Sequence, residues 1–207
     1  MKKYALPTHK QCLRMLKEHH VPSHIVAHSL AVAKLAVFLS ERLKEKGLPV
    51  DVALVDSACL LHDIFRICEL EKSEAHEDAA YNLLKKKYPV LALTVKKHRY
   101  SSLLDEKERP TTWEEKLVYY ADKRVMHDRI VPLKERLEEA HKRNAPPCRR
   151  KARRNIDTAK IDGLIYKLEK EIFEEVGLDP LEVTAEFIDS SPNLAGRSRN
   201  TSAREGG

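Results

Sequence analysis

One stretch of the chain constrains its fold class more than any other. Residues 25–39 (IVAHSLAVAKLAVFL) are apolar on nearly every side at helical spacing, inside a longer helical pattern. A helix that is apolar almost all round is buried inside a bundle, not laid on its surface. The remaining segments are also typical of helices, and we find no internal repeat and no convincing alternating strand. We therefore predict an all-α bundle.

Capping residues and helix breakers place the other elements. Gly47 follows the first apolar helix as a C-terminal cap, and Gly177 ends an amphipathic helix in the same way. Thr112 and Glu115 form a capping box, which begins a long helix. Pro132 is expected to kink or break that helix. The predicted helices span residues 8–19, 22–46, 51–63, 73–87, 90–98, 112–145 with the break, 156–176, and a short last one that begins at Pro180.

The positive charge of the chain is concentrated in one segment. The net charge is +6, and residues 141–154 (HKRNAPPCRRKARR) contribute seven basic residues and no acid. The rest of the chain is therefore close to neutral. The segment has no interleaved aromatic side chains for base stacking, so we interpret it as a solvated linker. Binding of RNA through residues 141–154 is kept as the less favoured alternative.

Glycine is scarce, which excludes several enzyme classes. The first 195 residues contain only Gly47, Gly163 and Gly177. No glycine-rich phosphate loop of the dinucleotide or P-loop kind fits these positions, so Rossmann dehydrogenases, P-loop NTPases and kinases are excluded. The four cysteines form no C-x-x-C pair, and buried thiols of a reducing compartment are their expected state. They are Cys12, Cys59, Cys68 and Cys148.

The chain also lacks the signals of a membrane or secreted protein. No run reaches the roughly 20 apolar residues that a spanning helix needs. The short basic N-terminus has no apolar signal core. We therefore expect a cytoplasmic protein without a membrane partner.

Polar residues at two places interrupt these apolar helices. His62 and Asp63 end the apolar run ACLLHDIF. Adjacent side chains point about 100° apart on a helix, so both reach one ion only near a helix end. His28 lies inside the apolar stretch over 25–39, and His24 lies one turn earlier, at the spacing of a metal-binding pair. The ordinary interpretation of His62-Asp63 is a solvated pair or a cap, and that of His28 is a hydrogen-bonded core residue.

Asp122 is the third candidate, in the run LVYYADKRV. Its apolar neighbours indicate burial, and a buried carboxylate needs a cation or a hydrogen-bond network to offset its desolvation. The adjacent Lys123 and Arg124 are the simplest partners. The order of all the candidates along one bundle is more informative than any single one.

The ordered set His28, His62-Asp63 and Asp122 resembles the signature of the HD superfamily of metal-dependent phosphohydrolases, as an HDIG-type member of an uncharacterised subgroup. The matching segments are HSLAVAKLA from residue 28, ACLLHDIF from residue 58 and TWEEKLVYYADKRV from residue 112. The resemblance covers about residues 8–140. It implies an HD-domain helical bundle in which these four side chains are metal ligands.

Some members of that superfamily bind two ions through two further histidines. His76 (EAHEDAAYNLL) and His98 (TVKKHRY) lie in the right interval, and the first resembles the binuclear symmetrical diadenosine tetraphosphate hydrolases. Imidazole with carboxylate suits Fe, Mn, Zn, Ni or Co better than Mg. We therefore expect one or two divalent transition-metal ions, with Asp63 as the bridge. Histidines in polar surroundings are predicted to be surface residues: His9, His19, His20, His127 and His141.

The resemblance implies hydrolysis of a phosphate ester or anhydride of a nucleotide or related small molecule. A metal-bound hydroxide would attack phosphorus, since the ion lowers the pKa of its water. Asp63, Arg66 and Lys123 are the predicted catalytic residues, and Arg66, Lys123 and Arg124 are candidates to hold phosphate. Members often have His-Asp-Ile-Gly-Lys where this chain has Phe65 and Arg66 in the last two positions. We expect an intact metal site with an altered substrate preference.

Two alternatives remain open: an HD bundle that senses a nucleotide with little or no turnover, and an RNA-associated protein. The predicted boundaries are a phosphohydrolase domain over 1–140, a basic linker over 141–155, a C-terminal helical extension over 156–188 and a disordered tail over 189–207.

Overall fold

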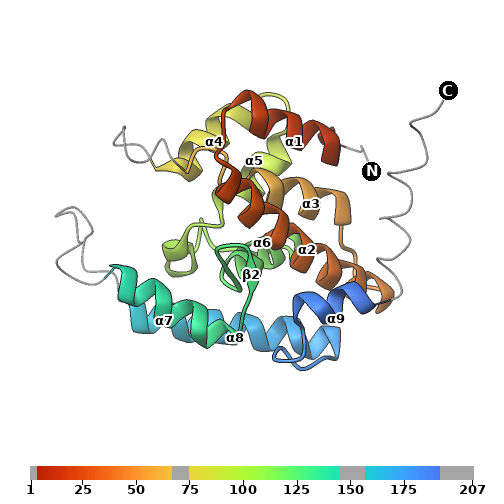
Figure 1. Ribbon diagram of the computed structural model, residues 1–207, viewed down its shortest axis with the longest axis vertical. Coiled ribbons are helices and arrows are strands. Elements are labelled where there is room, and N and C mark those ends of the chain that lie inside the picture. Colours follow the sequence, from red (N-terminus) through yellow and green to blue (C-terminus); the bar gives the residue numbers. More distant parts are fainter. Residues whose placement is uncertain (1–3, 67–74, 145–156, 192–207) are drawn as a thin grey trace.

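The computed structural model describes residues 4–66, 75–144 and 157–191. Figure 1 shows helices stacked in a bundle, with a small hairpin near its centre. The all-α prediction is confirmed. The helices are α1 (His9–Glu18), α2 (Ser23–Glu45), α3 (Val52–Leu61), α4 (His76–Leu84), α5 (Pro89–Lys96), the 3-10 helix η2 (Tyr100–Leu104), α6 (Trp113–Asp122), α7 (Leu133–Asn144), α8 (Thr158–Val176) and α9 (Ala185–Ser190).

Helix α2 is the centre of the bundle. It packs most extensively against α3 and α6, and Val32, Leu35 and Leu39 on it are fully buried. Among the described helices, α2 is long and apolar enough to cross a membrane, by length and composition only, and 50% of its most apolar window is buried. A buried apolar helix at the centre of a bundle has the same composition, so this property does not identify a membrane span.

The helix boundaries follow the predicted caps. The Thr112 side chain accepts a hydrogen bond from the Glu115 amide, and the Glu115 carboxylate accepts one from the Thr112 amide, so the capping box is confirmed. Gly47, with φ +86°, follows α2. Gly177 adopts the left-handed conformation, φ +73°, and ends α8. Both glycines relieve the strain that a Cβ atom meets at positive φ.

The structure differs from the prediction in the segment around Pro132. The long helix ends at Asp122, and an antiparallel hairpin follows, formed by β1 (Val125–Met126) and β2 (Arg129–Ile130). The expectation that the chain has no strand was therefore wrong at this turn. Strands of two residues are too short to show an alternating pattern. The last short helix also begins later than predicted, after the cap residue Thr184 and not at Pro180.

The C-terminal helices share the main core. Ile161, Ile165 and Ile172 of α8 are fully buried in the same apolar cluster as α2, α3 and α6. The Phe173 ring meets the Tyr120 ring of α6 edge-on, with centroids 5.9 Å apart. Most of the predicted basic linker over 141–155 and of the predicted tail over 189–207 lies outside the described residues, but 141–144 belong to α7 and 189–190 to α9. The domain boundaries stay a prediction.

Candidate metal centre

Three helices far apart in the sequence bring the first set of predicted ligands together. His28 comes from α2, His62 follows α3 directly, and Asp122 is the last residue of α6. The Nε2 atoms of His28 and His62 lie 3.1 and 3.6 Å from Asp122 Oδ1. His62 Nε2 is also 3.6 Å from Asp63 Oδ2. The packing of α2 against α3 and α6 therefore places imidazole nitrogens and carboxylate oxygens around one point.

The second set lies on the other side of Asp63. His76 begins α4 and His98 follows α5, and their Nε2 atoms are 3.3 Å apart. The same two atoms are 3.0 and 3.7 Å from Asp63 Oδ1. Because Oδ2 faces His62 and Oδ1 faces the second pair, Asp63 has one oxygen directed at each set. This is the arrangement expected of a bridging carboxylate.

Hydrogen bonds to the main chain orient three of the four histidines. In each of the three, ring atom Nδ1 lies within hydrogen-bond distance of a carbonyl oxygen. A carbonyl oxygen only accepts, so Nδ1 carries the hydrogen and the other nitrogen faces the centre; such bonds fix the tautomer of metal-binding histidines. The bonds join His28 to His127 (2.7 Å), His62 to Cys59 (2.7 Å) and His98 to Val95 (2.5 Å).

The site fits a divalent metal. His62 Nε2 is buried and has no hydrogen-bond partner in the described residues, although carboxylate oxygens lie 3.6 Å from it on two sides. A neutral imidazole nitrogen there has its lone pair directed at anionic oxygens, a repulsion that a cation between them relieves. Imidazole and carboxylate together are typical ligands of divalent transition metals. Buried His and Asp groups able to hold a metal are thus present.

The charges of the site change the pKa values of its members. Burial lowers the pKa of His62, but the Asp63 and Asp122 carboxylates outweigh it and the net shift is upward. Burial raises the pKa of Asp122, yet Lys123 and the neighbouring imidazoles hold it well below its usual value. Asp63 is lowered well below its usual pKa by the same balance, with His62 the largest favourable charge. Burial lowers the pKa of His98. The carboxylates are therefore anionic near neutral pH.

Glu77 belongs to the site but was missed in the sequence. Its carboxylate is buried, with Oε2 3.4 Å from His76 Nδ1 and 3.6 Å from Arg99 Nη2. His76, Glu77 and His98 offer ligand atoms within 4.8 Å of one another. A carboxylate on the far nitrogen of a histidine orients a metal ligand. The acid directly after His76 was the available signal.

The predicted phosphate-binding cations have three different positions. Arg66 Nη1 is 3.8 Å from Asp63 Oδ1 and its side chain is 44% exposed, so it reaches both the centre and solvent. Lys123 is buried against Asp122. The expectation for Arg124 was wrong, because its guanidinium is buried in the core and donates to the carbonyl oxygens of Val131 and Pro180. Consecutive residues of a helical turn point in different directions, which separates Arg124 from its neighbours.

Arg143 of α7 is an exposed cation that pairs with Glu139, Nη1 to Oε1 at 3.7 Å, and its charge interacts with those of Arg66 and Asp122. Burial lowers its pKa, as do the nearby charges of Arg136 and Arg66, whereas Glu139 and Asp122 act in the opposite sense. Helix α7 is held in place by Arg136, whose Nε donates to the Val125 carbonyl at 2.8 Å. Nothing in the local sequence of α7 distinguishes Arg143 from its basic neighbours.

The other histidines lie outside the centre. His24 is exposed and belongs to none of the described metal-binding groups, so the suggested pair with His28 was wrong. Four of the five predicted surface histidines are exposed, and His141 is partly buried in an ion pair with Asp162 at 2.7 Å. The His127 main-chain carbonyl, at the tip of the hairpin with φ +59°, nevertheless supports His28.

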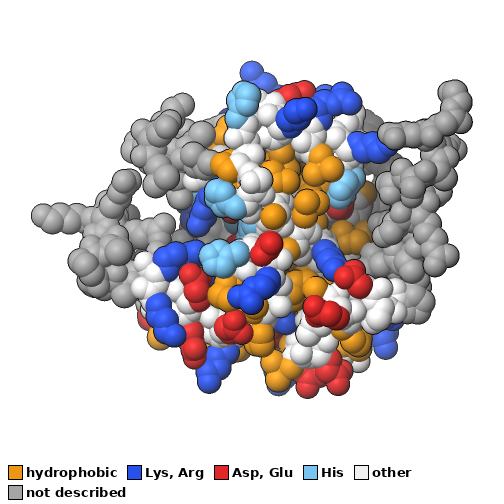
Figure 2. All heavy atoms as spheres, viewed as in Figure 1, with side chains coloured by type: hydrophobic (Ala, Val, Ile, Leu, Met, Phe, Trp, Pro, Cys, Tyr) orange, Lys and Arg blue, Asp and Glu red, His pale blue; other side chains and the backbone are white. Residues whose placement is uncertain are grey.

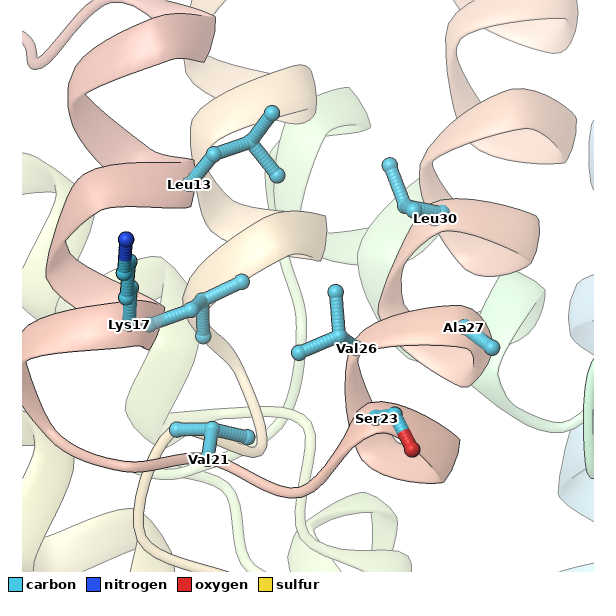
Figure 3. Close-up of a pocket in the computed structure, with 8 residues that line it drawn as sticks. Leu13, Lys17, Val21, Ser23, Val26, Ala27 and Leu30 are labelled. Carbon is cyan, nitrogen blue, oxygen red and sulfur yellow. The ribbon is translucent and has the colours of Figure 1, made fainter.

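The surroundings of the centre include two apolar features. Phe65, at the position where related motifs have glycine, packs its ring edge-on against His19, with centroids 5.2 Å apart. A shallow apolar groove lies between α1 and α2 (Figure 3), and none of the candidate ligands lines it. Leu13, Val26 and Leu30 are among its lining residues. The groove is therefore separate from the metal centre.

Comparisons with known proteins agree with this geometry. The family model described as "HD domain" matches residues 25–126, which include all six predicted ligands. A relative, the tRNA (cytidine(56)-2'-O)-methyltransferase of Picrophilus torridus, is 30% identical over 151 residues. The match covers 67% of this chain but 42% of that protein, so the chain spans about two fifths of the relative's length. No solved structure matches. Residues 25–126 are an HD domain, the domain that defines the HD superfamily.

Proposed function

We propose that this chain is a metal-dependent phosphohydrolase that acts on a phosphate ester or anhydride of a nucleotide or related small molecule. The observation that carries the proposal is the convergence of the His28, His62 and His98 Nε2 atoms on the carboxylates of Asp63 and Asp122. Each imidazole is fixed by a bond from Nδ1 to a carbonyl oxygen. A protein that aligns so many ligand atoms without a cation between them has an electrostatic cost that a bound metal removes.

The ligands divide into two positions. His28, His62 and Asp122 would hold one ion, and His76 and His98 would hold a second. Asp63 serves both, because its two oxygens face opposite sets. The metal is one of Fe, Mn, Zn, Ni or Co, since the donor set combines nitrogen with oxygen.

The chemistry that such ions supply when bound is a water of lowered pKa, which acts as a nucleophile near neutral pH. The chain itself supplies the phosphate contacts. Arg66 extends from the centre toward solvent, and Arg143 lies close enough to Arg66 for their charges to interact. Two guanidinium groups at the edge of an acidic centre suit the anionic oxygens of a phosphate. Figure 2 shows Lys and Arg side chains beside histidines on one face of the molecule.

Metal analysis of the protein as purified, followed by a hydrolysis screen with that metal, tests the proposal. Asp63→Ala should lose bound metal and hydrolysis and keep the helical circular-dichroism spectrum. Asp56→Ala is the matched control, because it removes a surface His–Asp pair of the same kind, His9 Nδ1 to Asp56 at 3.0 Å. Purified protein without a transition metal, or an Asp63→Ala variant as active as wild type, would contradict the assignment.

The phosphate contacts have their own test. Arg143→Gln should raise KM for the best substrate of the screen by about tenfold, the value of a charge-assisted hydrogen bond, and leave bound metal unchanged. Lys142→Gln removes the same charge from the adjacent residue, which is exposed as Arg143 is, and should leave KM close to wild type. Equal effects of the two changes on KM would show that the overall positive charge of α7 matters and that Arg143 makes no specific phosphate contact.

An RNA-associated role is the second candidate, favoured by the relative that acts on tRNA. The basic segment 141–154 would make the contact through phosphates. If so, affinity for tRNA should fall steeply with salt, and replacing four arginines should abolish it: Arg149, Arg150, Arg153 and Arg154. Binding of nucleotides without turnover on the hydrolysis screen would instead favour a sensor.

We also infer a reducing compartment, the cytoplasm. Cys12 and Cys59 are buried free thiols, and burial raises the pKa of Cys12 to about 12. Such thiols are inert and need no oxidising environment. Full reaction of both cysteines with a thiol reagent after unfolding would confirm that they remain reduced.

A further inference from the structure

Lys123 has contacts unlike those of a substrate-binding residue. Its side chain is 9% exposed. Its Nζ donates to Asp122 Oδ2 at 2.5 Å and to the main-chain carbonyl of His98 at 3.0 Å, and it lies 4.7 Å from the ring centroid of Tyr119. An ammonium enclosed by a carboxylate, a carbonyl and an aromatic face is directed at the protein. Phosphate would have to displace these contacts to reach it.

The two hydrogen bonds join the two halves of the centre. Asp122 belongs with His28 and His62, whereas His98 belongs with His76. The His98 ring is held separately by the bond from Nδ1 to the Val95 carbonyl. Lys123 therefore fixes a side chain of the first half to the main chain of the second.

Lys123 also gives the two oxygens of Asp122 different partners. Oδ2 accepts from Lys123, and Oδ1 faces the Nε2 atoms of His28 and His62 at 3.1 and 3.6 Å. Holding one oxygen with an ammonium stops the carboxylate from rotating and leaves the other oxygen directed at the imidazoles. A ligand held in this way loses less conformational freedom when it binds an ion.

We propose that Lys123 is a positioning residue of the metal centre, not a ligand of substrate phosphate. It presents Asp122 Oδ1 as a one-oxygen ligand and couples the position at His28 to the position at His98. The inference rests on the proposed function, because it assumes that these side chains hold metal.

Simple electrostatics predicts the opposite effect of removing the lysine. A cation next to a metal site repels the metal, so loss of Lys123 through charge alone would strengthen metal binding. Loss of positioning would weaken it, and outer-shell partners of metal ligands are typically worth 10–100-fold in affinity. The sign of the change therefore separates the two roles.

The chain contains a matched control for this experiment. Lys97 also comes from the end of α5, and its Nζ is 2.8 Å from the Glu115 carboxylate of α6. Its side chain is 17% exposed, and Glu115, its ion-pair and hydrogen-bond partner, is no candidate ligand. Lys97→Met removes a lysine–carboxylate pair that joins α5 to α6, the two helices that Lys123 joins through the His98 carbonyl.

The experiment uses cobalt(II) as the probe, titrated into the full metal-free chain in competition with a chelator and followed by visible absorption. Lys123→Met should bind cobalt about 10–100-fold more weakly with an altered absorption spectrum. Lys97→Met should bind it as wild type. Lys123→Arg keeps the charge with a different donor geometry and should fall between the two. If Lys123→Met does not fold by circular dichroism, Lys123→Arg decides the question.

Each other outcome overturns a stated part. Wild-type affinity for cobalt in Lys123→Met, joined to a raised KM for substrate, would make the lysine a phosphate ligand. Tighter binding of cobalt by Lys123→Met would show that Lys123 affects the metal only through its charge. Wild-type protein that binds no cobalt, zinc, manganese, nickel or iron would overturn the proposed function, and this inference with it.

Discussion

Helix α6 has a largely buried lysine–carboxylate pair at each end, and the two pairs differ in their surroundings. Lys97 and Glu115 meet near its N-terminus at 2.8 Å, and Lys123 and Asp122 meet at its C-terminus at 2.5 Å. Burial opposes the charged form of both carboxylates, and in both cases the net pKa is lowered by partners. By burial, distance and charge alone the two ends are alike.

The two pairs differ in the further partners of their carboxylates. The Glu115 carboxylate accepts from Lys97, from the Thr111 amide and hydroxyl, and from the Thr112 amide. All of these are donors, so the group is satisfied within the protein. Asp122 Oδ1 instead faces imidazole nitrogens that are already oriented by other bonds. A buried ion pair is therefore weak evidence of a site, whereas an acceptor aimed at further acceptors indicates a missing cation.

The largest effect is expected at Asp122. Asp122→Ala removes an oxygen ligand and the partner of Lys123, so metal affinity should fall by more than about 100-fold, beyond the usual effect of an outer-shell change. Chelator competition with cobalt(II) measures it. Glu115→Ala is the matched control and should leave the affinity unchanged. If both variants lose metal equally, the two ends of α6 are not distinct.

The next largest effect is expected when the two groups of candidate ligands near Asp122 are changed separately. His28→Ala should remove the ion held with Asp122, and His76→Ala the ion held with His98, so each should lower the stoichiometry from two ions toward one. Elemental analysis after removal of loosely bound metal gives the count. Asp63→Ala should lose both. A stoichiometry of one in wild type, abolished by either change, would indicate a single shared ion.

The sequence alone predicted the side chains that converge at this end better than the groups that support them. His28, His62-Asp63 and Asp122 are recognisable because they interrupt apolar helices in a fixed order. Lys123 and Arg124 look equivalent in sequence, yet one contacts Asp122 and the other the Pro180 carbonyl, because side-chain direction depends on the turn after α6.

Supports contributed by the main chain leave no trace in side-chain chemistry. The His127 carbonyl that orients His28 exists because a hairpin follows α6, and a strand of two residues has no readable pattern. The overall helical bundle was predictable because apolar periodicity is averaged over many residues. Glu77 had a signal, its place next to His76, but a charged residue in the first turn of a helix is ordinary.

At the other end of α6 the expected effect is on stability. Glu115→Gln keeps the shape of the side chain but removes the charge of the carboxylate that accepts from Lys97 and two amides. The free energy of unfolding should therefore fall by about 1.5–3 kcal/mol, the range for hydrogen bonds to charged groups. Urea unfolding of metal-free protein measures the difference. Metal affinity should be unchanged, and any loss of metal would show that the structural end also supports the centre.

The smallest expected effect is the pH dependence of the difference in stability between wild type and Glu115→Gln. Burial raises the pKa of Glu115, but Lys97 and the amides of Thr111 and Thr112 lower it by more, so the pKa in the folded state is below the usual value of 4.5. A group with a depressed folded pKa stabilises the protein above its unfolded pKa, and this contribution is lost as pH falls through the folded pKa. Asp63 and Asp122 titrate in the same sense, so the wild-type curve alone is not specific.

Subtracting the Glu115→Gln curve from the wild-type curve isolates Glu115, since the metal-site carboxylates are common to both proteins and distant changes add. The subtracted stability should be constant near neutral pH and should decline as pH falls below 4.5. A difference that persists unchanged in acid would mean that the charge of Glu115 is not its cause, because the protonated carboxyl and the Gln amide would then still differ as helix-cap groups when both are neutral. In that case the two ends of α6 would differ in charge as well as in partners, and the ionic pair at the metal centre would be the one that matters.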